Sequence, residues 1–317
     1  MRTAIGLMLL SAALFAAASS PSFTVAVVRR DGVIVPFANY DGKSWSTRWP
    51  DPVADPQIPI NLSSVPSRWW GAAGPRVEWA TWIDNRAGAS IRVEQTDVVS
   101  AHCVRQVGLR TNYRSAIPPP PPDEQPYPKD GLAISPPQTI EAIESIDRRA
   151  PQLSGLNGIL RDAFNRAENT TAQSFNHPVE RKQREQSEPL IEAVYAFGQA
   201  PRTYYVEAVR TYELSNDRFS VSGGGFPFEN SKTCGIAFGT GWFARDQSGF
   251  HAVDMAVRMV PCDRYGATYM LPFGAMPLGS HTYWIAQFSG WDHERYVVVD
   301  LQPKSVEAVI NAWGGGC

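Results

Sequence analysis

Segments in both the first and the second part of this 317-residue chain either alternate apolar and polar residues with the period of two of a half-buried β-strand or are rich in β-branched and aromatic residues. The pattern predicts strands at residues 24–30, 33–37, 76–83, 90–99 and 104–112 in the first part of the chain. In the second part it predicts strands at 190–197, 203–214, 233–246, 250–262, 283–288 and 295–301. Residues 305–313 are ambiguous, although their valines favour a strand.

Short turn motifs separate many of these runs and predict antiparallel hairpins. Asp31-Gly32 and Asp41-Gly42 each lie between or beside strand patterns, and Gln247-Ser248-Gly249 separates the two longest runs. Pairing Asp246 with Phe250 across this last turn fixes the register of the hairpin. One of its faces is then wholly apolar and carries Ala237, Gly239, Gly241 and Phe243 opposite Met259, Val257, Met255 and Val253.

The other face of the hairpin is mixed and predicts a disulfide. It carries Phe238, Trp242, Asp254 and Arg258, and it places Cys234 directly opposite Cys262. Directly opposed residues in a ladder lie at a separation that a disulfide can span. We therefore expect Cys234 to pair with Cys262, which leaves Cys103 to pair with Cys317.

Helical patterns are confined to the middle of the chain. Five consecutive prolines, 118–122, begin an extended connector, and a helical region follows it. Ile140, Ile143 and Ile146 are spaced by three residues, and a second helix is indicated by Leu156, Ile159, Leu160 and Phe164, with Ser154 as its N-cap.

The order of these patterns predicts a mainly β protein, α+β by content, built from antiparallel meanders and hairpins with a central helical insertion. Local alternation is the same in a sandwich, a barrel and a propeller-like fold, so all three stay open. We expect a signal peptide at 1–18, an N-terminal β meander at 19–117, a Pro-rich connector at 118–135, a helical insertion at 136–188 and a C-terminal β region at 189–317. Residues 19–317 are expected to form one globular unit; the alternative is a two-domain protein in which 19–117 acts alone.

The N-terminus has the features of an export signal. Arg2 precedes an apolar stretch that ends in Ala16-Ala17-Ala18, the small residues that a signal peptidase requires. Export would place the chain in an oxidising compartment, secreted or periplasmic, which agrees with four cysteines forming two disulfides.

Charge and motif content argue against several classes of partner. The 29 basic and 31 acidic residues are nearly balanced, so nucleic acid is not an expected partner. No apolar run after the signal is long enough to cross a membrane, and no metal-binding spacing or cofactor motif is present, so we expect neither a metal nor a cofactor.

The densest group of functional side chains lies at an expected hairpin tip. Trp291, Asp292, His293 and Glu294 follow one another there and are our candidate binding residues, with no catalytic residue assigned. His102 is interpreted as a surface histidine beside a disulfide cysteine. Two tryptophan pairs could form a stacking platform for sugars, but we favour core packing for each tryptophan: Trp69 with Trp70, and Trp79 with Trp82.

These observations favour a non-enzymatic, exported protein whose β scaffold binds a ligand or an envelope protein, or has a structural role. The alternative is a secreted hydrolase with active-site residues contributed by distant loops, Asp292, His293 and Glu294 foremost. The sequence matches no family that would carry a function over.

Overall fold

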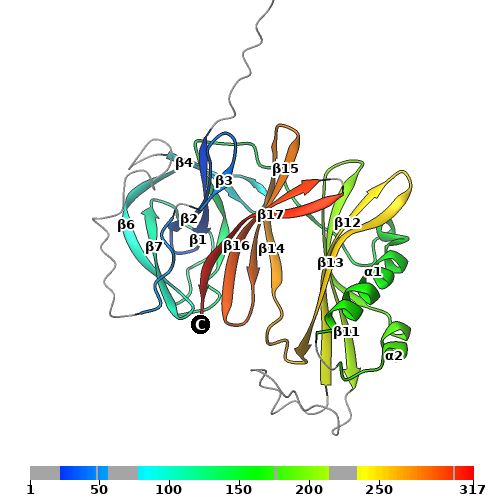
Figure 1. Ribbon diagram of the computed structural model, residues 1–317. Coiled ribbons are helices and arrows are strands. Elements are labelled where there is room, and N and C mark those ends of the chain that lie inside the picture. The colour runs from blue at the N-terminus through cyan, green and yellow to red at the C-terminus, as the bar shows by residue number, and fades with distance from the viewer. Residues whose placement is uncertain (1–21, 48, 56–77, 175–176, 214–233, 303) are drawn as a thin grey trace, which may run out of the picture.

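A computed structural model describes residues 22–47, 49–55, 78–174, 177–213, 234–302 and 304–317 of the protein. The fold is mainly antiparallel β, as the sequence predicts, and consists of a closed barrel, a four-stranded sheet and a five-stranded sheet. The four-stranded sheet lies between the other two units, and two helices cover the far side of the five-stranded sheet (Figure 1). The expected signal peptide lies outside the described residues.

The barrel is formed by the first part of the chain. Six strands close on themselves in the order β1-β8-β4-β6-β7-β2, because β2 also pairs with β1. Buried side chains from all six strands fill the inside, among them Ala26, Ile34, Trp79, Ile91 and Leu109. The strands of this unit, with the short β3 and β5 beside it, are β1 (Phe23–Arg29), β2 (Val33–Tyr40), β3 (Trp45–Ser46), β4 (Glu78–Ile83), β5 (Arg86–Ala87), β6 (Ile91–Ala101), β7 (Val104–Thr111) and β8 (Lys129–Ser135).

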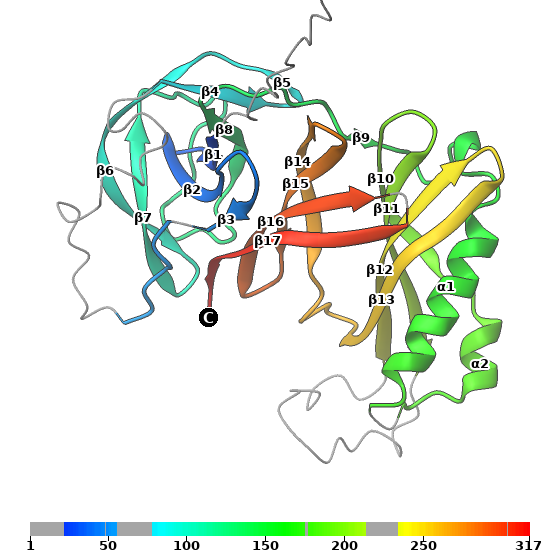
Figure 2. The same ribbon diagram turned by 45° about the horizontal axis from the view of Figure 1, so that its top comes forward.

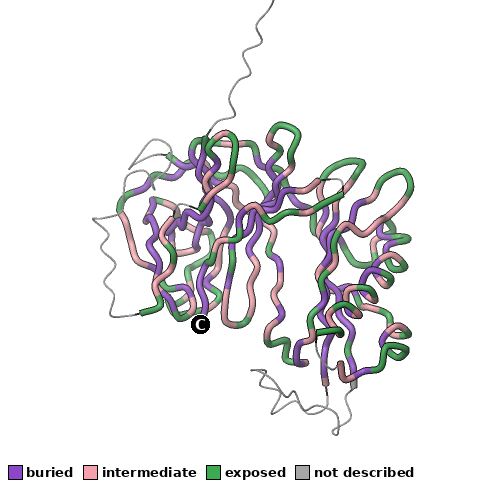
Figure 3. Tube along the Cα trace, in the orientation of Figure 1, coloured by how far each residue is buried: buried purple, intermediate pink, exposed green. Residues whose placement is uncertain are grey.

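The two inner strands of the central sheet are covered on both faces, which explains why they read as continuous apolar runs. The order of the sheet is β14 (Tyr269–Leu278), β15 (His281–Ser289), β16 (His293–Gln302) and β17 (Ser305–Gly316). Along β15, Tyr283 and Ile285 pack against the barrel, whereas Trp284 and Ala286 pack against the five-stranded sheet. The same alternation holds along β16, and Figure 3 shows the buried segments concentrated between the layers.

The five-stranded sheet carries the long hairpin and both helices. Its order is β13 (Gly249–Pro261), β12 (Cys234–Asp246), β11 (Arg202–Glu213), β10 (Leu190–Phe197) and β9 (Glu144–Ser145). Helix α1 (Leu156–Thr171) lays Leu156, Leu160 and Phe164 on the apolar face of β12 and β13, and Phe164 lies over Gly239. A short helix, α2 (Arg181–Gln186), follows.

Both expected disulfides are present, and the register of the hairpin of β12 and β13 differs from the prediction near its tip. The turn is tighter than predicted, because Asp246 pairs with Gly249 and Phe243 with Ala252 instead of Val253. A bulge at Val253 restores the expected register, so that Gly241 faces Met255. Cys234 is bonded to Cys262 and Cys103 to Cys317.

The isoleucines at 140, 143 and 146 are not helical, contrary to the prediction. Pro136 and Pro137 precede them, and the segment runs in extended form from the barrel to β9 (Figure 2). Ile140 enters the core beside the barrel, Ile143 the core between the two sheets, and Ile146 the core under α1. Six extended residues span about 20 Å, so the three isoleucines reach three separate cores. In a helix they would lie on one face and enter one core.

Three smaller differences concern the middle of the chain. Residues 129–135, expected at the end of the connector, form β8 of the barrel. The helix α1 begins after Gly155, whose φ of 86° is left-handed, so Ser154 is not its N-cap. Strand β14 was not expected because Pro272 and Pro277 interrupt its pattern, which its position at the edge of the sheet tolerates.

Candidate functional site

The four candidate binding residues, 291–294, lie in two different environments, one at the protein surface and one in the interior. Trp291 is 74% exposed in the turn between β15 and β16. Next to it, His293 Nδ1 lies 2.7 Å from Asp292 Oδ1, and the Tyr265 hydroxyl donates to the other carboxylate oxygen. This hydrogen bond to His293 lowers the pKa of Asp292. Asp292 and His293 thus form a pair at the protein surface.

Glu294 points the other way, into the boundary between the barrel and the central sheet. It is 1% exposed, and Lys129 Nζ from β8 lies 2.5 and 2.6 Å from its two oxygens. Tyr296 donates to the same carboxylate at 2.6 Å, and His102 Nε2 lies 3.9 Å away. Burial lowers the pKa of both Lys129 and His102. The carboxylate is therefore already bound by side chains of the protein itself.

His102 differs from the expectation, whereas Trp79 and Trp82 pack against core clusters, as we favoured from the sequence. The His102 side chain is 2% exposed, so it is not a surface histidine; the tight turn at Ala101–Val104 directs it toward Glu294. Trp79 is fully buried in the barrel, and Trp82 donates from Nε1 to the carbonyl of Phe273. Both belong to the packed interior, whereas Trp69 and Trp70 lie outside the described residues.

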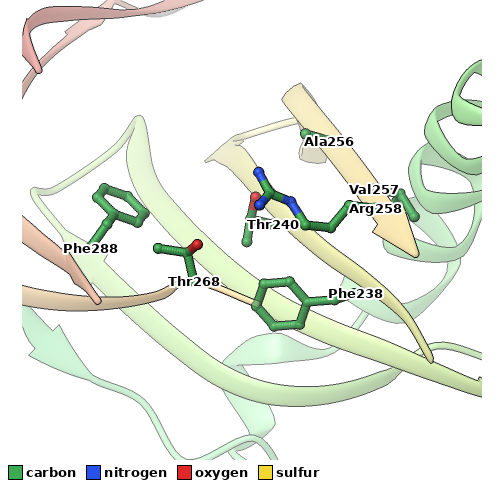
Figure 4. Close-up of a pocket in the computed structure, with 7 residues that line it drawn as sticks. All are labelled: Phe238, Thr240, Ala256, Val257, Arg258, Thr268 and Phe288. Carbon is green, nitrogen blue, oxygen red and sulfur yellow. The ribbon is translucent and has the colours of Figure 1, made fainter. Parts of the chain in front are cut away.

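A pocket of about 280 Å³ opens on the mixed face of the β12–β13 hairpin. On this face of β12, Trp242 packs on Trp284 and Phe238 packs on Tyr269, both with ring centroids 5.1 Å apart. Thr240 lies between these two aromatic contacts, and its short side chain leaves the space between the sheets unfilled. The pocket is lined by Phe238, Thr240, Ala256, Val257, Arg258, Thr268 and Phe288 (Figure 4).

Arg258 supplies the charge of this pocket. It lies opposite Phe238 on β13, and its Nη1 donates to the carbonyl of Gly266 at 3.1 Å. No described carboxylate forms an ion pair with it, whereas nearby Arg264 is held by both oxygens of Glu192. Figure 4 shows the Arg258 guanidinium and the hydroxyls of Thr240 and Thr268 around the same space.

Glu207 lies beside the pocket, next to Thr240 on the same face of the sheet. It is directly opposite Thr240 across the β11–β12 ladder, and its Oε1 accepts a hydrogen bond from the Met270 amide at 2.7 Å. The residue is 2% exposed, and burial raises the pKa of its carboxyl to about 7. Below that pH the carboxyl is neutral, so the positive charge of Arg258 dominates the pocket.

The Cys234–Cys262 disulfide fixes the sheet beside this pocket. It joins the end of β12 to the residue after β13, and Cys262 packs against the cluster that contains Phe238, Val260 and Ala267. The crosslink thus holds the strands that carry Phe238 and Arg258 at a constant separation.

Sequence reasoning placed Arg258 on the mixed face but assigned it no role, and it missed Glu207, Thr240, Thr268 and Phe288. One signal was available for Glu207, because it is the one acidic residue within the apolar and aromatic run 203–209. A carboxylate in a strand that is buried on both faces has an unusual environment. Thr268 and Phe288 lie near β12 only because two sheets pack together. No local pattern in the sequence indicates this proximity.

Comparison with known proteins adds no relative: no protein-family model matches the chain, and no curated protein or solved structure matches it significantly. Within the described ranges, no group of three or more His, Cys, Asp or Glu side chains is arranged to hold a metal ion. None of the helices in the described part of the chain is long and apolar enough to cross a membrane.

Proposed function

We propose that the protein is an exported, non-enzymatic binding protein, and that the pocket around Arg258 binds a small anion with an apolar body. The observation that carries the proposal is an arginine without a carboxylate partner among the described residues, set beside two threonine hydroxyls. A guanidinium binds carboxylate and phosphate groups through charge-assisted hydrogen bonds. The rings of Phe238 and Phe288 offer an apolar surface for the rest of the ligand.

The crosslinks and the N-terminus support the proposed compartment. Two disulfides are typical of an oxidising environment outside the cytoplasm. Together with the signal-like first 18 residues, they support a secreted or periplasmic location. The ligand would then be a small molecule or part of an envelope component.

The hydrolase remains the alternative, and one observation weighs against assigning it to Asp292, His293 and Glu294. A general acid or base must reach a substrate, yet the Glu294 carboxylate is buried and bonded to Lys129 and Tyr296.

The test uses the exported chain with its disulfides formed, and probes of defined charge. Ligand-detected NMR would compare benzoate and hexanoate with their neutral isosteres benzamide and hexanamide. We expect at least one anion to bind more tightly than its neutral counterpart. R258Q should weaken that binding by roughly tenfold or more, since a charge-assisted hydrogen bond is lost.

Arg245→Gln is the matched control, because Arg245 lies in the same sheet and also donates to one main-chain carbonyl, that of Gln152. It should bind the anions like the unmodified protein. The proposal would be overturned if none of the anions bound, if the neutral isosteres bound equally well, or if R258Q and R245Q behaved alike.

A further inference from the structure

A second pocket lies at the boundary between the barrel and the central sheet, away from Arg258. It has a volume of about 200 Å³ and is bounded by β2, by the segment after β3, and by β7, β16 and β17. Its aromatic walls include Phe37, Trp49 and Trp313, and its polar lining includes Asp51, Gln106 and Asn311.

The aromatic walls are held in place by the fold. Trp49 donates from Nε1 to the carbonyl of Val107 at 2.7 Å, which fixes one edge of its ring. Phe37 is buried against Tyr296, with ring centroids 5.3 Å apart. Trp313 is 38% exposed, so it borders the pocket and solvent at once. Rings of this kind present negative π faces to a ligand that lies against them.

The polar side chains leave hydrogen-bonding capacity unused. Gln106 is only 3% exposed, and its Nε2 donates to the carbonyl of Gly314, whereas no described residue donates to its Oε1. Asn311 accepts from Arg295 through Oδ1, which leaves its amide donors available. Asp51 adds an exposed carboxylate without a hydrogen-bond partner among the described residues. Since Gln106 lines the pocket, its Oε1 can accept a hydrogen bond from a ligand hydroxyl there.

We propose that this pocket binds a single sugar ring, such as the terminal unit of a glycan. A pyranose has faces of slightly positive C–H groups, which pack against aromatic rings, and a rim of hydroxyls that both donate and accept hydrogen bonds. The lining has the matching arrangement of aromatic walls with acceptors at Asp51 and Gln106 and donors at Asn311. A volume of about 200 Å³ is below the usual range for drug-sized ligands, which favours one ring.

The experiment measures binding of free glucose, galactose, mannose and N-acetylglucosamine to the exported chain, using ligand-detected NMR at millimolar concentration. Indole and phenol serve as flat aromatic probes without a hydroxyl rim. We expect at least one sugar to bind. Trp313→Ala should reduce that binding by roughly tenfold or more, and W313F should restore part of it, because a ring face returns.

Tyr265→Ala is the matched control, since Tyr265 is an aromatic residue as exposed as Trp313, at 38%, does not line this pocket and should leave sugar binding unchanged when replaced. Arg258→Gln should also leave it unchanged, which separates this proposal from the anion site. The proposal would be wrong if no sugar bound, if W313A and Y265A bound alike, or if only indole and phenol occupied the pocket.

Discussion

Replacing Glu207 with glutamine should remove a pH-dependent loss of stability. The carboxyl is buried between two sheets, and its pKa is about 7 in the folded chain, compared with 4.5 for an ordinary glutamate. In the unfolded chain the group ionises near 4.5, whereas the folded chain keeps its proton up to about pH 7. The unfolded state therefore binds fewer protons in this window, and stability falls as the pH rises.

The size of the effect follows from the difference between the two pKa values. It corresponds to about 3 kcal/mol once the pH is above 7, and to little below pH 4.5. Between pH 5 and pH 8 the ionisation of Glu207 should thus cost the unmodified protein about 2–3 kcal/mol of unfolding free energy. The glutamine side chain does not ionise between pH 5 and pH 8. Its amide oxygen can still accept the hydrogen bond from the Met270 amide.

The assay is urea unfolding followed by tryptophan fluorescence at pH 5 and pH 8, with the disulfides intact. At pH 5 the variant should lie within about 1 kcal/mol of the unmodified protein, and at pH 8 it should gain about 2–3 kcal/mol relative to it. Other titrating groups are common to both proteins and cancel in the comparison. Glu94→Gln, an exposed position on β6, should change stability equally at the two pH values. An E207Q difference that is the same at pH 5 and pH 8 would refute the reasoning.

Four further outcomes are expected. Ionisation of Glu207 should also weaken anion binding near Arg258, so the affinity for the best anionic probe should fall between pH 6 and pH 8 in the unmodified protein but not in E207Q. Lys129→Met leaves the Glu294 carboxylate buried without a cation and should cost about 3–5 kcal/mol in urea unfolding, much of which K129M/E294Q should recover. Removing Cys103–Cys317 by C103S/C317S should lower the unfolding free energy by about 2 kcal/mol more than C234S/C262S does, because the two bonds join residues separated by 214 and 28 positions. Gly239→Ala should cost about 1–3 kcal/mol in thermal unfolding, since a Cβ there would lie 2.5 Å from the Phe164 ring. The control for this last outcome is Gly158→Ala, in a part of α1 where a Cβ meets nothing within 4 Å, which should instead stabilise by about 0.5–1 kcal/mol.

Hairpins were predicted well because their signals are local. Asp31-Gly32 supplies the turn between β1 and β2, where Gly32 has a φ of 82°, and the alternation around it fixes which side chains are buried. The Cys234–Cys262 pairing could be deduced from register alone, since the bulge at Val253 offsets the tighter turn. Cys103–Cys317 then followed by elimination, although those two residues are far apart in the sequence.

The errors arose where a pattern had a long-range cause. The isoleucines at 140, 143 and 146 have a helix-like spacing because an extended segment crosses three cores, which the sequence cannot distinguish from one helical face. His102 was interpreted as exposed because nothing local indicates that Glu294 and Lys129 come together beside it. Both cases depend on how the barrel and the sheets are stacked.

The two candidate pockets share this dependence on stacking. The central sheet is covered on both faces, and each pocket lies where one of its faces meets a neighbouring unit. In the first, Trp242 and Phe238 hold the two sheets apart on either side of the short Thr240, so the space results from one small residue between two large contacts. In the second, the barrel contributes Phe37 and Gln106 and the central sheet contributes Trp313. The residues that line each pocket come from several strands and loops. The polar groups of both pockets could therefore be identified only from the packing of the barrel and the sheets.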